Sequence, residues 1–168
     1  GPGLFTGLRV GLATAKGLAF ALDVPMIGIS SLDLLAFPMA HAARPVVAAI
    51  DARRGEVYHA TYRPVPGGMQ REGDYAVSRP EELAADIVAR GEPVLAIGDG
   101  IARYAELFAT VDGVELDGPL DRHPSASALV DLAHPMAVRE EFRRIDQVEP
   151  IYLRQPDAEI NWVTRDQP

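Results

Sequence analysis

The chain has 168 residues, 48% of them hydrophobic, which is enough for one domain, or for one domain of two lobes, with a real core. It contains no cysteine, so disulfides and thiolate metal sites are excluded and a reducing cytosol is permitted. The formal net charge of −8 argues against the chain gripping a nucleic acid backbone by itself, because phosphate contacts need clustered Lys and Arg.

The first predicted element is a helix over about residues 5–22, which carries three glycines. Each glycine costs about 1 kcal/mol relative to alanine in a helix interior. Gly7, Gly11 and Ala15 recur at every fourth position, along one edge where another backbone could approach closely. Glycine and charge interrupt this apolar run, and it resembles neither a signal peptide nor a membrane span. We therefore expect a soluble protein.

The same helix has a wide apolar arc and a narrow charged strip. At about 100° per residue, Arg9 and Lys16 share the strip, and Phe5, Ala13 and Phe20 flank it. The arc consists of Leu8, Leu12, Ala15, Leu18, Ala19 and Leu22. An aromatic side chain beside the only polar face suggests contact with a second protein. Periodicity alone nevertheless favours a buried core helix of an ordinary α/β domain over such an interface helix.

An apolar run at residues 24–30 is predicted to be a strand that leads into a helix through about Ala42. Ser30 is expected to cap that helix, with Asp33 in its first turn. Both features are typical of the strand-to-helix step of an α/β domain.

Residues 45–64 contain two β-rich runs around the sequence Asp-Ala-Arg-Arg-Gly, the pattern of a hairpin with a glycine-assisted turn. A turn at 65–68 and a third antiparallel strand at 69–77 are predicted to follow. A helix over 79–91 has Ser78 as its expected N-cap, proline in its first turn and glycine at its end. The order predicts α/β alternation around an antiparallel hairpin.

Residues 93–109 read as a buried strand, a Gly-Asp-Gly turn at 98–100 and a helix. That turn could bind a phosphate, although short strand-to-helix turns also use glycine for geometry alone, which is the reading we favour. A strand near 111–117 and a helix near 125–138 complete the predicted elements.

Candidate catalytic groups are few. The four histidines, at positions 41, 59, 123 and 134, include no pair at metal-binding helical spacing. Asp51, Glu56 and Asp99 are the carboxylates nearest turns, and we interpret them as turn or surface residues. The residues by themselves therefore indicate an α/β domain with no evident catalytic apparatus.

Four stretches together resemble the TsaB (YeaZ) family: GPGLFTGLRVGLATAKGLA (1–19), VPMIGISSLDLLA (24–36), AAIDARRGEVYHATY (48–62) and EPIYLR (149–154). Leu4 departs from the family pattern, which usually has serine there. The resemblance implies the two-lobed fold of actin, sugar kinases and Hsp70, with ribonuclease H-like lobes. Residues 1–44 would then be the remainder of the first lobe, 45–154 the second lobe and 155–168 a polar tail.

The resemblance also implies a function. Members of this family are cytoplasmic, non-catalytic partners of TsaD, which makes threonylcarbamoyladenosine in tRNA, and the ATPase TsaE joins the complex. We expect tRNA to be met only through the complex, and a homodimer is possible. The partner surface is expected to consist of Phe5, Thr6, Arg9, Ala13, Lys16 and Phe20, with Gly7, Gly11 and Ala15 giving close helix packing.

The comparison with TsaD bears on metal and nucleotide. TsaD carries a metal-binding His-x-x-x-His, and the matching positions here look like Ser31 and Leu35, which are poor ligands. Relatives grip phosphate with small residues at a hairpin turn that here contains Arg53 and Arg54. We therefore expect no cofactor and no metal. The alternatives are a glycoprotease-like metallohydrolase and a nucleotide-binding enzyme of the same fold.

Family members begin well upstream of the GPG motif, so the sequence is expected to be a fragment whose first lobe is incomplete. The strands that would cover the apolar arc of the first helix are then absent. We expect Leu8, Leu12, Leu18 and Leu22 to lack cover within the chain, and residues 45–154 to fold largely on their own.

Overall fold

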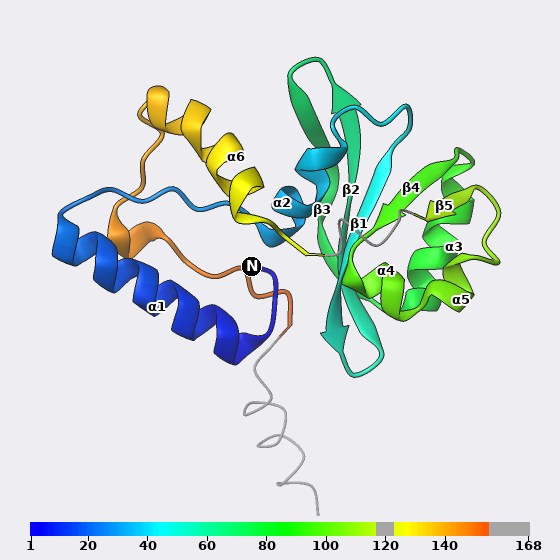
Figure 1. Cartoon of the computed structure of the whole chain (residues 1–168). Coiled ribbons are helices and arrows are strands. Elements are labelled where there is room, and N and C mark those ends of the chain that lie inside the picture. The colour runs from blue at the N-terminus through cyan, green and yellow to red at the C-terminus, as the bar shows by residue number, and fades with distance from the viewer. Residues whose placement is uncertain (117–122, 155–168) are drawn as a thin grey trace, which may run out of the picture.

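The computed structural model describes residues 1–116 and 123–154. Its helices are α1 (Phe5–Leu22), α2 (Ser31–Ala36), α3 (Pro80–Arg90), α4 (Asp99–Arg103), α5 (Ala105–Phe108) and α6 (Ala126–Val138), with 3₁₀ turns η1 (Phe37–Met39) and η3 (Ile145–Gln147). Its strands are β1 (Val46–Arg53), β2 (Glu56–Val65), β3 (Gly68–Ser78), β4 (Val94–Ile97) and β5 (Val114–Leu116). Figure 1 shows a sheet with its helices on one side of the molecule and α1 and α6 on the other.

The five strands form one mixed sheet in the order β3-β2-β1-β4-β5. β1, β2 and β3 pair antiparallel, while β4 and β5 continue the sheet parallel to β1. Arg53, Arg54 and Gly55 make the β1–β2 turn with positive φ angles of 62°, 56° and 77°. The predicted hairpin, third strand and α/β order are confirmed.

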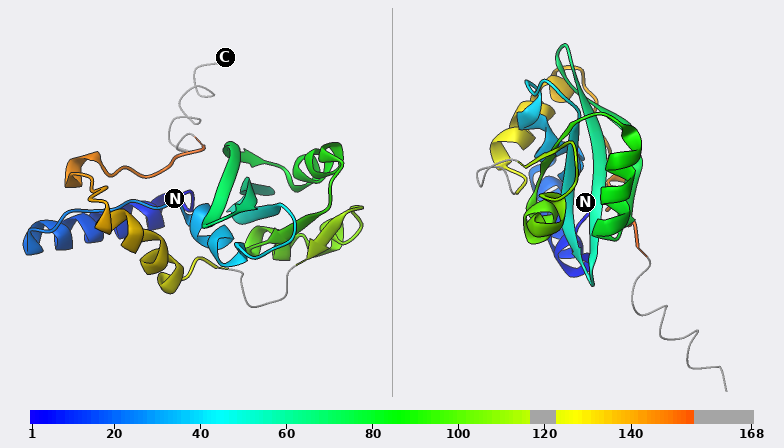
Figure 2. Two further views of the ribbon diagram at one scale, coloured as in Figure 1. Left: turned by 90° about the horizontal axis from the view of Figure 1, so that it is seen from above. Right: turned by 90° about the vertical axis from the view of Figure 1, so that its right-hand side faces the viewer.

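β1 is buried on both faces, which explains its continuous apolar sequence. On one face, Leu32, Leu35 and Ala36 of α2 pack with Val46, Ala48 and Tyr62 in one core cluster. On the other face, the second cluster joins α3 and α5 to the sheet through Leu83, Ile87, Phe108, Val47 and Val57. The end-on view in Figure 2 shows α3 and α2 on opposite sides of the sheet.

Helix α1 lies apart from the sheet (Figure 1), and Ala19 is the only buried residue among its 18. The buried core helix that periodicity favours is therefore not seen within the described residues. Leu18 is 59% exposed and Leu22 is 69% exposed, while Leu8 and Leu12 are half-buried. The expectation that this arc lacks cover is confirmed for Leu18 and Leu22, whereas Leu8 and Leu12 are partly covered within the described residues. None of the described helices is both long and apolar enough to cross a membrane.

Residues 24–30 are extended but are not a strand, so that prediction is wrong. Their one bridge in the described structure joins Met26 to Arg143 through two backbone hydrogen bonds of 2.8 and 3.3 Å. An apolar, β-prone run becomes a strand only when a neighbouring backbone pairs with it along its length. Here the pairing stops after a single residue.

Three helix boundaries also differ from the prediction. The helix after Ser30 ends at Ala36 and continues only as η1, which contains Pro38, instead of reaching Ala42. The N-cap of α3 is Arg79, because the Ser78 hydroxyl bonds to His59 while the Glu82 carboxylate accepts from the Arg79 N–H. The helix after Gly98 breaks at Tyr104 into α4 and α5.

Candidate partner interface

The predicted partner residues lie together along the outward face of α1, defined here as Phe5, Thr6, Arg9, Ala13, Lys16 and Phe20. All are exposed except Lys16, which is half-buried, and Phe20 is 79% exposed. Val10 is exposed as well. Scattered apolar residues are normal on a protein surface, but a contiguous set along one helix is typical of an interaction site.

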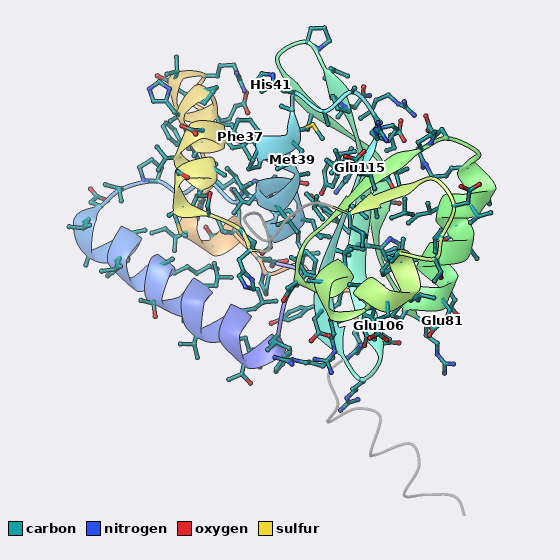
Figure 3. The ribbon with its side chains drawn as sticks, turned by 45° about the vertical axis from the view of Figure 1, so that its right-hand side comes forward. Phe37, Met39, His41, Glu81, Glu106 and Glu115 are labelled. Atoms are coloured by element: carbon teal, nitrogen blue, oxygen red, sulfur yellow. The ribbon has the colours of Figure 1, made fainter. Side chains whose placement is uncertain are left out.

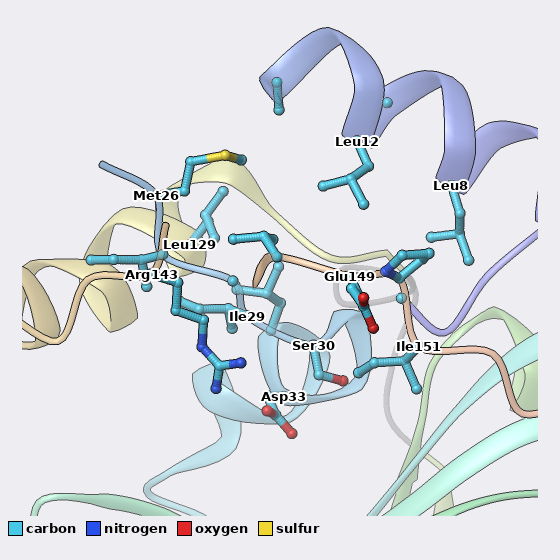
Figure 4. A pocket seen from close by; sticks show the side chains of 18 of the residues that line it. Leu8, Leu12, Met26, Ile29, Ser30, Asp33, Leu129, Arg143, Glu149 and Ile151 are labelled. Carbon is cyan, nitrogen blue, oxygen red and sulfur yellow. The ribbon is translucent and has the colours of Figure 1, made fainter. Parts of the chain in front are cut away.

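The opposite face of α1 borders a cavity of about 550 Å³, here called cavity 1. Leu8 and Leu12 point from α1 toward Ile29 and Ser30 across this space (Figure 4). A Cβ added at Gly7 or Gly11 would meet nothing within 4 Å. The structure thus places Gly7, Gly11 and Ala15 on the cavity wall, and their role in close packing stays a prediction.

The start of α1 is attached to the last described residues by an aromatic cluster. The Arg9 Nε donates a hydrogen bond of 3.0 Å to the Tyr152 hydroxyl, and the Arg9 guanidinium lies 4.0 Å from the Phe5 ring centroid. The Phe5 and Tyr152 rings are 5.4 Å apart between centroids. Sequence reasoning missed Tyr152, although its aromatic ring stands in the EPIYLR stretch. Phe5 and Arg9 are therefore oriented within the chain, whereas Ala13 and Phe20 are left outward.

The two positions compared with the TsaD histidines have other roles in this structure. Ser31 opens α2, and its backbone N–H donates to the Gly1 carbonyl at 2.8 Å. Leu35 is 2% exposed in the core beneath the sheet. In residues 1–116 and 123–154 no group of three or more His, Cys, Asp or Glu side chains is placed to hold a metal ion.

Residues at the β1–β2 turn already form hydrogen bonds and ion pairs within the chain. The Arg53 backbone N–H donates to the Asp51 carboxylate at 2.9 Å, and that carboxylate also pairs with the side chains of Arg53 and Arg103 at 3.3 and 3.2 Å. Asp99 in turn accepts from the Asp51 N–H at 3.2 Å. An N–H that could face a phosphate therefore already has an acceptor. Asp51 is a buried residue of β1, so the expectation of a turn or surface residue is wrong for it.

Comparison with known proteins identifies the family. Residues 1–162 match the family model described as "TsaD: tRNA N6-adenosine threonylcarbamoyltransferase". The chain is 34% identical over 157 residues to the tRNA threonylcarbamoyladenosine biosynthesis protein TsaB of Escherichia coli, covering 92% of this chain and 68% of that protein. It is 30% identical over 169 residues to TsaB of Bacillus subtilis, and the match covers 97% of this chain and 70% of that protein.

A solved structure gives the same result. YeaZ from Pseudomonas aeruginosa superposes with a TM-score of 0.72 at 35% sequence identity, covering 91% of this chain and 71% of that one. Sequence and fold agree over nearly the whole described chain. The chain therefore belongs to the TsaB (YeaZ) family of tRNA threonylcarbamoyladenosine biosynthesis proteins.

Proposed function

We propose that this chain is a non-catalytic subunit that pairs with the catalytic TsaD in making threonylcarbamoyladenosine in tRNA, and that the outward face of α1 is its docking surface. The observation that carries the proposal is a helix of 18 residues with one buried residue and two basic side chains, in a chain of this family. Such a helix gains stability when a partner removes its apolar side chains from water.

The charge of the chain supports a protein partner rather than direct tRNA binding. With a net charge of −8, the chain as a whole repels phosphate, and Arg9 and Lys16 are the only basic residues of α1. We infer that tRNA is reached only through the complex, in the cytoplasm, with TsaE as a further member. A second copy of the chain could occupy the same surface as a homodimer.

The local structure at the positions that match the TsaD metal ligands, and at the β1–β2 turn, supports a non-catalytic role. Leu35 is a core residue without a metal-binding atom, and the Arg53 N–H is already bound to Asp51. We also infer that the fold is actin-like. The strand order 3-2-1-4-5, antiparallel and then parallel, is typical of a ribonuclease H-like lobe, so the sheet would be the core of the second lobe of an actin-like pair and α1 part of the first. Because α2 packs in the core of the sheet and α6 lies with α1, the expected bounds of 1–44 and 45–154 would shift accordingly.

Co-purification tests the pairing. The chain and tagged TsaD of the same organism are co-expressed, and the captured material is run by size exclusion. We expect both chains in one peak, because the exposed face of α1 is covered in the complex. Separate elution of two folded proteins would contradict the proposal.

Calorimetric titration tests the two alternatives in the same preparation. A metallohydrolase would bind Zn²⁺, and a nucleotide-binding enzyme would bind ATP, with a Kd near 1 µM, about −8 kcal/mol. We expect neither. Tight binding of either ligand would favour the corresponding enzyme reading over the non-catalytic subunit.

A further inference from the structure

A second cavity of about 500 Å³, here called cavity 2, lies between α6, η1 and the β2–β3 hairpin, with no residue of α1 in its wall. Figure 3 shows Phe37 of η1 beside α6, where it closes one side. The apolar lining is Ile29, Phe37, Val65, Met69, Leu132 and Met136, and the polar lining is Asp33, Tyr62, Arg71 and Tyr75. A mostly apolar space of this size with a few convergent polar groups is typical of a small-molecule site.

The Asp33 carboxylate is held by two tyrosines at one end of cavity 2. The Tyr62 hydroxyl donates to Asp33 Oδ1 at 2.8 Å, and the Tyr75 hydroxyl lies 3.0 Å from Oδ1 and 2.8 Å from Oδ2. Burial, and then the Asp33 charge and hydrogen bond, raise the pKa of Tyr62, so its proton stays in place. Each hydroxyl has only one proton to donate, and both protons are directed to Asp33. The remaining capacity of the three groups is to accept hydrogen bonds.

Arg71 supplies the opposite charge without neutralising Asp33. Its guanidinium carbon lies 3.8 Å from the centroid of the Tyr75 ring, whose hydroxyl binds Asp33. In the described part of the chain, neither Arg71 nor Asp33 forms an ion pair, whereas Arg63 and Arg44 each pair with a glutamate. Asp33 also borders cavity 1, where burial lowers the pKa of the Gly1 amino group and the Asp33 charge opposes that shift. A carboxylate and a guanidinium thus line one cavity, and Tyr75 contacts both of them.

We propose that cavity 2 binds a small zwitterion, a free α-amino acid with an apolar side chain. Its ammonium would donate to Asp33 and the tyrosine oxygens, its carboxylate would accept from Arg71, and its side chain would lie against Met69, Leu132 and Met136. An anion alone would leave Asp33 unpaired, and a cation alone would leave Arg71 unpaired. A ligand with both charges would give each group an opposite charge in addition to its contacts with the tyrosines.

The first test is a calorimetric titration of the folded protein with L-leucine and with two analogues that each keep one charge, 3-methylbutylamine and 4-methylpentanoate. We expect saturable binding of leucine with a Kd at or below roughly 1 mM. Each analogue loses one charged contact and is expected to bind at least about tenfold more weakly. No saturable binding of leucine, or equal binding of leucine and either analogue, would overturn the proposal.

The second test locates the site with three variants. Asp33→Asn and Arg71→Gln are each expected to weaken leucine binding at least about tenfold. Arg44→Gln is the matched control, because Arg44 is an exposed arginine paired with Glu115 and does not line cavity 2. Its affinity for leucine is expected to equal that of the unmodified chain. Unchanged binding in Arg71→Gln would overturn the proposal even if Asp33→Asn failed to fold. None of these results depends on pairing with TsaD.

Discussion

Gly98 is the residue whose missing side chain matters most for the fold. A Cβ at this position would lie 2.1 Å from the Ala49 carbonyl oxygen and 2.6 Å from a Leu35 methyl group. Its φ of 103° is also one that side chains rarely adopt. This contact between the end of β4 and the backbone of β1 explains the Gly-Asp-Gly turn as geometry, the reading that the sequence favoured.

Replacing Gly98 with alanine should therefore destabilise the protein by about 3–5 kcal/mol, because backbone and core must both move. Gly67→Ala is the matched control, since Gly67 has a φ of 92° and open space around its Cβ position. That variant should cost only about 1–2 kcal/mol of backbone strain. Urea denaturation measures both, and equal losses would show that the close approach at Gly98 contributes nothing.

His59 links stability to pH. It is buried in β2 with its Nε2 3.0 Å from the Ser78 hydroxyl. Burial lowers the pKa of the imidazole, against a smaller raising effect of Asp86. Because the folded pKa lies below the unfolded value of about 6.5, the unfolded chain binds more protons below that pH. The stability that neutral His59 contributes is thus present above about pH 6.5 and is lost as the pH falls toward the folded pKa.

We expect the urea midpoint to fall between about pH 7 and about pH 5, and this fall to be smaller in His59→Gln. His134→Gln is the control, because His134 is exposed on α6. It should keep the pH dependence of the unmodified chain. A fall of the same size in His59→Gln would assign the effect to other groups.

At the scale of the element, α1 should be the least protected helix of the isolated chain. Few buried contacts hold it, whereas β1, β2 and β4 lie at the centre of the sheet. In hydrogen exchange, amides at 5–22 should exchange much faster than those at 46–62 and 93–97, unless an oligomer covers them. Strong protection of 5–22 in a dilute sample shown to be monomeric would mean that the chain itself covers the apolar arc.

Local patterns predicted most of the elements. The β1–β2 hairpin and α3 could be predicted because the β-rich runs, the turn glycine and the terminal glycine lie within the segments themselves. Residues 24–30 could not be predicted correctly, because strand formation depends on a neighbour distant in sequence. The break at Tyr104 also had no local signal.

Some features of the candidate site could be predicted from the sequence and others could not. The outward face of α1 followed from helical spacing, because that face is a property of one element. The Arg9–Tyr152 contact joins residues 143 positions apart, and the Tyr75–Asp33 contact joins residues 42 apart. Contacts of that kind depend on the tertiary fold, and one sequence gives no spacing rule for them. Cavity 2 therefore became visible only in the structure.

For the whole molecule, the exposed face of α1 and the family to which the chain belongs lead to one account, in which TsaD covers this face. Ala13 lies exposed at the middle of α1 and should pack closely against the partner. Ala13→Glu places a charge there without disturbing the chain's own core. Ala89→Glu is its matched control, an exposed alanine on α3, beyond the sheet from α1 (Figure 1).

The account is tested most directly by calorimetric titration of TsaD with three proteins: the unmodified chain, Ala13→Glu and Ala89→Glu. A buried, unpaired charge costs several kcal/mol, so Ala13→Glu should weaken TsaD binding at least about 100-fold, while Ala89→Glu should bind as the unmodified chain does. Equal affinity of TsaD for all three folded proteins would contradict docking through the outward face of α1.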